Sequence, residues 1–321
     1  MEISVPLSTS NSDYPLPQAP WLKSLGLAIL FFLCLVATLE GGLASLGYNP
    51  TVSDSSEKWI EQRARASTLG KRALILVGAS RILLDLDLDA LRVATGLEPV
   101  QLALDGQAGG PILEGLARDP TIVGTVLVDY YDGGIGIHGQ AASNMQRRYD
   151  ETVAKSKYFT QPAPEIEKTL TALLKEHLRV YADGANPFTS LRWRLLSKLP
   201  SPRYITTLPD RSRIADYSKI NIQEAYYSRV IRNLGLEKQL APKPPNIEQN
   251  LSQQITMLTP EDNSRFVVEA RKVRRLVSII QDRGGQVIFV AMPTSGMIRD
   301  IEKRRYPQQE FWNRFLIETG V

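Results

Sequence analysis

Residues that could do chemistry gather in four short segments, and each segment follows an apolar run. They are Gly78–Arg81, Asp105–Gly110, Asp129–Gly139 and Pro293–Gly296. The Ser80 hydroxyl can attack a carbonyl carbon once a base takes its proton. Glycines such as Gly106, Gly109 and Gly110 let backbone N–H groups come close to the oxyanion that forms in such a reaction. A serine and such donors on one sheet edge would favour acyl transfer.

Ser80 also has a plain structural interpretation. Serine is favoured as the N-cap of a helix, where its hydroxyl accepts a hydrogen bond from a backbone N–H. Sequence spacing does not separate a capping serine from a nucleophilic one, so both roles stay open at this point.

Buried strands and helices must alternate to position these segments. Four apolar runs, each ended by Gly, Asp or Pro, predict strands at Ala73–Val77, Val100–Leu104, Gly124–Val128 and Gln286–Met292. Helices are predicted at Asp89–Thr95, Gly110–Arg118 and Arg265–Arg283. Short apolar runs that alternate with helices are typical of a parallel sheet in a three-layer α/β fold, where ligands sit beyond the carboxyl ends of the strands.

The interval from about 140 to 260 breaks this rhythm. It predicts helices at Ala141–Lys157, Pro164–Tyr181 and Ile222–Leu234, joined by proline-rich loops. Since none of its runs resembles a buried strand, we interpret it as a helical insertion between the third and fourth strands.

A nucleophilic serine needs a base, and the chain contains two histidines. His138 lies just beyond the third predicted strand, on the same sheet edge as Ser80, so it is a possible substitute base. The alternative, which we favour, is an incidental histidine in a glycine-rich surface loop. His177 is predicted on a helix surface. Two histidines and one cysteine leave too few ligands for a zinc site of His and Cys, and we expect no metal or cofactor.

One segment near the N-terminus is apolar enough to cross a membrane. Residues 24–39 carry no charge, and as helix they are about 24 Å long. Lys23 and Trp21 suit the lipid interface, and residues up to 47 extend the span past Glu40. A signal peptide cleaved after Ala44 is the alternative, but the leader is long for one and almost uncharged. We expect an uncleaved anchor at 24–47 and a bilayer as its partner.

Charge adds little beyond this. The net charge is +4, and no basic stripe predicts nucleic-acid binding. We expect a cytoplasmic tail at 1–23, the anchor at 24–47, a stalk at 48–70 and an α/β domain at 71–321, which Lys23 places outside the cytoplasm.

The motif order resembles the SGNH (GDSL-like) hydrolases, above all their membrane-anchored bacterial members. The resemblance rests on a buried strand followed by Gly78-Ala-Ser-Arg81, then a strand ended by Asp105-Gly-x-x-Gly109. It implies a flavodoxin-like parallel sheet, with Ser80 as the nucleophile and the Gly106 N–H in the oxyanion hole. It also implies ester hydrolysis or acyl transfer, often on cell-envelope carbohydrate.

Two parts of the family pattern are missing from this sequence. The third family block offers an asparagine, where this chain reads Val128-Asp-Tyr-Tyr131. The family base comes from an Asp-x-x-His motif after a fifth strand, and neither precedes Val321. We therefore expect a poor esterase, and the alternative is a catalytically silent envelope protein that keeps the fold as a binding or assembly module.

Overall fold

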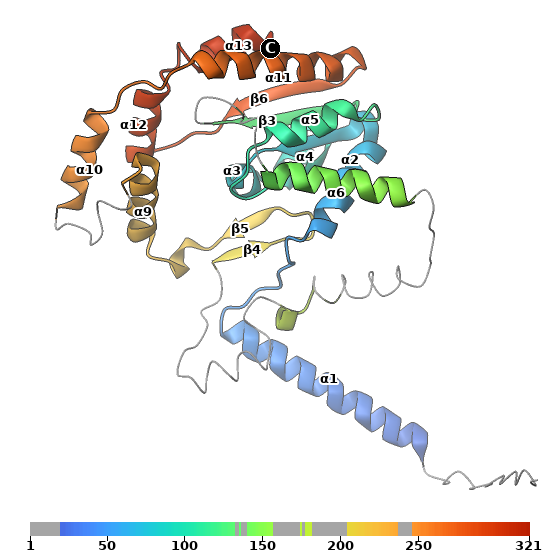
Figure 1. Ribbon diagram of the computed structural model, residues 1–321. Helices are drawn as coiled ribbons and strands as arrows, with labels where there is room; N and C mark the ends of the chain where they lie inside the picture. Colours follow the sequence, from blue (N-terminus) through green and yellow to red (C-terminus); the bar gives the residue numbers. More distant parts are fainter. Residues whose placement is uncertain are drawn as a thin grey trace, which may run out of the picture.

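The protein is described by a computed structural model for residues 20–131, 135, 140–156, 174, 177–181, 204–236 and 246–321. In Figure 1 a parallel sheet lies between helices, and one long helix points away from this domain. The arrangement is α/β with a helix layer on each face of the sheet.

Four strands form the sheet, in the order β2-β1-β3-β6. They are β1 (Ala73–Val77), β2 (Glu98–Gln101), β3 (Thr125–Tyr130) and β6 (Gln286–Ala291). All three neighbouring pairs are parallel, as predicted. β2 begins two residues before its predicted start, and its ladder with β1 continues beyond the strand, because Leu102 N donates to Leu76 O (2.9 Å) and Leu104 N to Gly78 O (3.0 Å).

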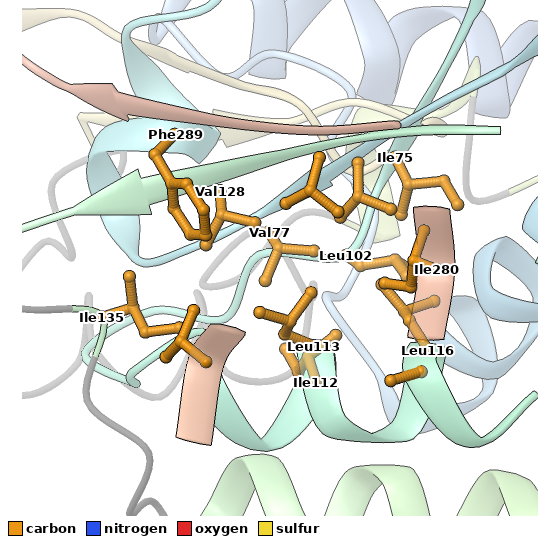
Figure 2. Packing of buried hydrophobic residues seen from close by; sticks show 14 of the residues in the cluster. Ile75, Val77, Leu102, Ile112, Leu113, Leu116, Val128, Ile135, Ile280 and Phe289 are labelled. Carbon is orange, nitrogen blue, oxygen red and sulfur yellow. The ribbon is translucent and has the colours of Figure 1, made fainter. Parts of the chain in front are cut away.

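One face of the sheet carries the main core. Alternate strand residues such as Ile75, Val77 and Val128 are fully buried there, and Figure 2 shows them against Ile112 and Leu116 of the covering layer. That layer consists of α2 (Ser56–Leu69), α5 (Gly110–Arg118), α6 (Gln140–Ser156), α11 (Ser264–Asp282) and α13 (Trp312–Thr319). Strand side chains alternate between faces, so the remaining strand residues must be covered from the other side.

The opposite face is covered by two short helices, α3 (Ser80–Leu84) and α4 (Leu88–Thr95). Leu74 and Leu76 of β1 are buried against Ile82 and Leu83 of α3. The cover thins toward the β6 edge, where Ile288 is 46% exposed.

The predicted stalk contributes to the core. Trp59 of α2 is fully buried, and its Nε1 donates to Leu102 O at 3.0 Å. Helix α2 is therefore part of the same helix layer as α5 and α6.

The insertion between β3 and β6 is mixed in structure, so its purely helical interpretation is wrong. An antiparallel hairpin, β4 (Ile205–Thr207) and β5 (Arg213–Ala215), precedes α9 (Ile222–Leu234). These strands are short and polar, so no apolar run marked them. The predicted helices at 141–157 and 222–234 are confirmed, and most of Pro164–Tyr181 lies outside the described residues, apart from Leu174 and the segment that ends in η2 (Arg179–Tyr181).

Helix α9 packs with α10 (Ile247–Thr256) and α12 (Gly296–Arg305) around a separate small core. This helical group lies beside the carboxyl edge of the sheet in Figure 1. It includes Val230, Leu251 and Ile298.

Helix α1 (Trp21–Ser45) has 25 residues and is long and apolar enough to cross a membrane. Its length as an α-helix is about 37 Å. Its large apolar side chains from Trp21 to Leu35 are exposed, as a lipid-facing segment requires.

Candidate active site

Ser80 and Gly106 follow neighbouring parallel strands. The last hydrogen bond between these strands runs from Leu104 N to Gly78 O, and Ser80 and Gly106 each come two residues after that point. Since parallel strands lie about 4.8 Å apart, the two candidate residues leave the sheet side by side. This is the juxtaposition expected from the sequence.

Gly78 makes the turn at the end of β1 possible. Its φ is +159°, and a Cβ there would lie 2.6 Å from Asp129 Cβ and 2.7 Å from Ile82 Cγ1. Both distances are too short for real contacts. Glycine is required here because β3 and α3 both approach the backbone closely.

Ser80 does not act as the helix cap. Helix α3 begins at Ser80, its N-cap is Ala79, and no side-chain bond caps it. Ser80 is half-buried, and its hydroxyl makes no hydrogen bond with another described residue. The capping role that competed with the nucleophile role is therefore not found.

The glycines of the second segment have different tasks. Gly106 is exposed with φ +65° and open space around its Cβ position. Gly109 and Gly110 are buried; a Cβ on Gly109 would lie 2.9 Å from Val77 Cγ1, and Gly110 N donates to Ile135 O at 3.3 Å. Only Gly106 of these three therefore presents its backbone to solvent.

The structure adds an ion pair that sequence reasoning missed. Arg81, the residue after Ser80, places one Nη 3.3 Å from both carboxylate oxygens of Asp129, which is 1% exposed. The same Nη lies 3.4 Å from Tyr130 O, and the guanidinium lies over the Tyr131 ring at 5.4 Å. The pair ties the Ser80 turn to the end of β3. The signal in the sequence was a charged residue shortly after each of two buried runs, Asp129 directly after Val128 and Arg81 four residues after Val77.

Two further charged groups lie near this pair. Burial raises the pKa of Asp85, at the end of α3, although the positive charges of Arg81 and Arg229 oppose the shift. Arg229 belongs to α9, so a positive charge from the helical group acts on Asp85 at this edge of the sheet.

The structure describes only one of the two histidines. His138 lies outside the described residues. His177 is exposed and comes just before η2, which contacts α1 at the anchor end of the domain. No base is hydrogen-bonded to Ser80 within the part of the chain that the structure covers.

Tyr130 is a packing residue. It is 7% exposed and lies edge-on to Trp312, with ring centroids 4.8 Å apart. Burial raises the pKa of its hydroxyl well above the ordinary value. Among the described residues no group of His, Cys, Asp and Glu could hold a metal ion.

Comparison with protein-family models, with curated proteins and with solved structures found no match to this chain.

Proposed function

We propose that this chain is a membrane-anchored, SGNH-like ester hydrolase or acyltransferase that acts outside the cytoplasm, with Ser80 as its nucleophile. The supporting observation is the position of Ser80 and Gly106 after neighbouring parallel strands, with Ser80 making no capping bond. In this scheme the Ser80 oxygen attacks an ester carbonyl carbon and the ester C–O bond breaks. The serine proton ends on the departing alkoxide, which leaves as the alcohol. Water or a second hydroxyl then releases the acyl group.

The backbone provides the charge stabilisation in this proposal. The N–H groups of Ser80 and Gly106 hold the oxyanion of the tetrahedral intermediate. Arg81 and Asp129 act as positioning residues, because the ion pair between the half-buried Arg81 and the buried Asp129 connects the Ser80 turn to β3. The resemblance described above suggests an acylated envelope glycan as the substrate.

The second candidate is a catalytically silent binding or assembly module with the same fold. It is favoured by one observation: no described base contacts Ser80. General-base assistance contributes roughly 10²- to 10⁴-fold to rate, so a serine without it reacts slowly.

A fluorophosphonate serine probe on the full-length protein in detergent separates the two candidates. We expect slow labelling that Ser80→Ala abolishes and that Ser252→Ala, on the exposed surface of α10, leaves unchanged. Labelling that survives Ser80→Ala contradicts the proposed nucleophile. No labelling after prolonged exposure supports the silent module. A further loss in His138→Ala identifies His138 as the base.

Topology has its own test. Protease added to intact spheroplasts should degrade the domain at 48–321, because Lys23 favours a cytoplasmic N-terminus. Full protection of that domain would place it on the cytoplasmic side and reject the proposed location.

A further inference from the structure

A cavity of about 460 Å³ lies between the anchor and the sheet edge. It is lined by the segment after α1, by the β4–β5 hairpin and by Asp105. A volume of this size suits a small ligand or one sugar-sized group.

The cavity borders the candidate active site. Asp105 precedes Gly106 and accepts a hydrogen bond from Arg213 of β5 at 2.8 Å. The hairpin that carries Arg213 also contacts α3, which begins at Ser80. A ligand in the cavity therefore lies beside Asp105, the neighbour of Gly106.

The end of α1 is joined firmly to the domain. The two Glu40 carboxylate oxygens accept hydrogen bonds from the backbone N–H groups of Arg179 (2.9 Å) and Val180 (3.0 Å). Leu43 and Tyr48 are buried together, with Leu39 and Val180 packed against them. The last turns of α1 thus pack against η2. The segment after α1 is bonded to the hairpin region, by Lys219 Nζ to Gly47 O and by Val52 N to Thr207 O, so the cavity has a set position relative to the end of α1.

These contacts also set its distance from a membrane. The stretch from Trp21 to Leu39 is about 28 Å long as a helix, close to the roughly 30 Å of a bilayer's hydrocarbon core. Gly47, the first cavity residue, comes seven residues after Glu40, which is about 10 Å along a helix. Each headgroup layer is about 5–8 Å thick. With α1 along the membrane normal, the cavity therefore starts at the outer border of the headgroups.

The lining favours an uncharged, hydroxyl-rich occupant. Its charges cancel: Asp54 and Asp105 oppose Arg213 and Lys219. Arg213 bonds both carboxylates, and Lys219 Nζ donates to Gly47 O at 3.1 Å, so both cations already have acceptors.

The remaining lining residues fit a sugar. Beside the apolar Val52 and Ile205, hydroxyl and amide groups line the cavity, from Tyr48, Asn49, Ser53, Tyr204, Thr206 and Thr207. The Thr51 hydroxyl is already bonded to the Thr207 backbone. Tyr204 also offers an aromatic ring of the kind that packs well with part-apolar surfaces. The Arg213 side chain is 10% exposed, and its buried Nε–H has no acceptor among the described residues.

We propose that this cavity binds the neutral sugar headgroup of a lipid embedded in the same membrane as α1. As a substrate site it rests on the function proposed for Ser80; as a binding site it stands on the cavity alone. The anchor then holds the domain at the height where such headgroups protrude.

The test uses the full-length protein in phosphatidylcholine nanodiscs that contain a monogalactosyl diacylglycerol with a diazirine on the sugar. After photolysis, we expect crosslinks that mass spectrometry maps to residues 47–54 and 204–213. Thr206→Trp, which fills the cavity, should lower this labelling at least tenfold. Ser252→Trp fills a second cavity of about 410 Å³ and should leave the labelling unchanged, and circular dichroism checks that both variants fold.

Three results would overturn the proposal. They are labelling that Thr206→Trp does not reduce, equal labelling of the same residues by a diazirine-bearing phosphatidylglycerol, and equal labelling by a soluble photoreactive galactoside at the same bulk concentration. Ser80→Ala should leave the crosslinks intact. In the unaltered protein, crosslinks without any fluorophosphonate labelling would reject only the enzyme, and fluorophosphonate labelling without crosslinks would reject only the sugar site.

Discussion

The core under the sheet and the junction between the hairpin and β2 are held together by opposite means. In the core, Leu113 and Leu116 of α5 pack fully buried against strand residues such as Ile75. At the junction, the equally buried Arg211 bonds Asp54 Oδ1 (2.7 Å), Gln101 O (2.6 Å) and Ala103 O (3.1 Å). Apolar packing is not directional, so a substitution there lowers stability roughly in proportion to the apolar area that it removes. A buried charge is stable only while its bonding partners are present, so the loss of one partner is strongly destabilising.

The junction also explains how β2 can stand at the edge of the sheet. Edge strands present unpaired carbonyls that invite pairing with other chains. Arg211 covers two of them, and it does so from a left-handed backbone conformation, φ 70°. Burial lowers the pKa of this guanidinium, although Asp54 opposes the shift. The residue keeps its charge because arginine stays protonated at any ordinary pH.

The largest expected effect comes from removing the Arg211 counter-charge. Asp54→Ala should lower the free energy of unfolding by about 3–5 kcal/mol, since it leaves a buried guanidinium without its carboxylate. Asp105→Ala removes a carboxylate that is 58% exposed and should cost at most about 1 kcal/mol. Denaturant unfolding of both variants measures the difference, and equal losses would show that the junction is no more sensitive than the surface.

A matched change in the core sharpens this comparison. Leu116→Ala should cost about 3 kcal/mol through lost burial and a cavity. Leu116→Met keeps the volume and should cost less than about 1.5 kcal/mol. Asp54→Asn keeps the shape at the junction but removes the charge. Its free energy of unfolding should therefore be only slightly higher than that of Asp54→Ala. Full recovery in Asp54→Asn would mean that shape, and not charge, stabilises the junction.

The two glycines of the candidate site should differ in the same measurement. Gly78→Ala forces a Cβ against Asp129 and Ile82 and should cost about 1–3 kcal/mol. Gly106→Ala has open space and meets only the left-handed backbone penalty of about 1–2 kcal/mol. Fluorophosphonate labelling should fall further in Gly78→Ala, because the Ser80 turn must move. An unchanged thermal midpoint in Gly78→Ala would contradict the close packing at this turn.

The smallest expected effect is a change in acid stability. Burial by itself raises the pKa of Asp119, but bonds from Thr121 and the charge of Arg63 outweigh it and lower the pKa below its ordinary value. The folded state thus binds this proton less readily than the unfolded state does. The stabilisation is present above the unfolded pKa of about 3.9 and is lost as pH falls through the lower folded pKa.

Asp119→Asn should therefore flatten the loss of unfolding free energy below about pH 4. Asp89→Asn, on the exposed surface of α4, serves as the control for general charge effects. Acid titration followed by circular dichroism compares them. If the free energy of unfolding falls as steeply below about pH 4 in Asp119→Asn as in the unaltered protein, Asp119 is not the responsible carboxylate.

Local pattern was enough to predict the four strands of the main sheet and several of the helices, but not the β4–β5 hairpin. The apolar runs at 73–77 and 286–292 became central and edge strands of one parallel sheet, and helices α5 and α9 have the predicted bounds. These features depend on periodicity and on terminators such as Gly78, which act within a few residues of the chain. The neighbouring positions of Ser80 and Gly106 follow, because parallel strands bring their carboxyl ends to one edge.

The tertiary structure alone decided the contacts between distant polar residues. Arg211 meets Asp54 across 157 positions, Glu40 meets Arg179 across 139, and Arg81 meets Asp129 across 48. Nothing near any of these residues in the sequence identifies its partner. A charge is stable in a buried position only when a specific partner arrives there, and that partner's arrival depends on the folding of the whole chain.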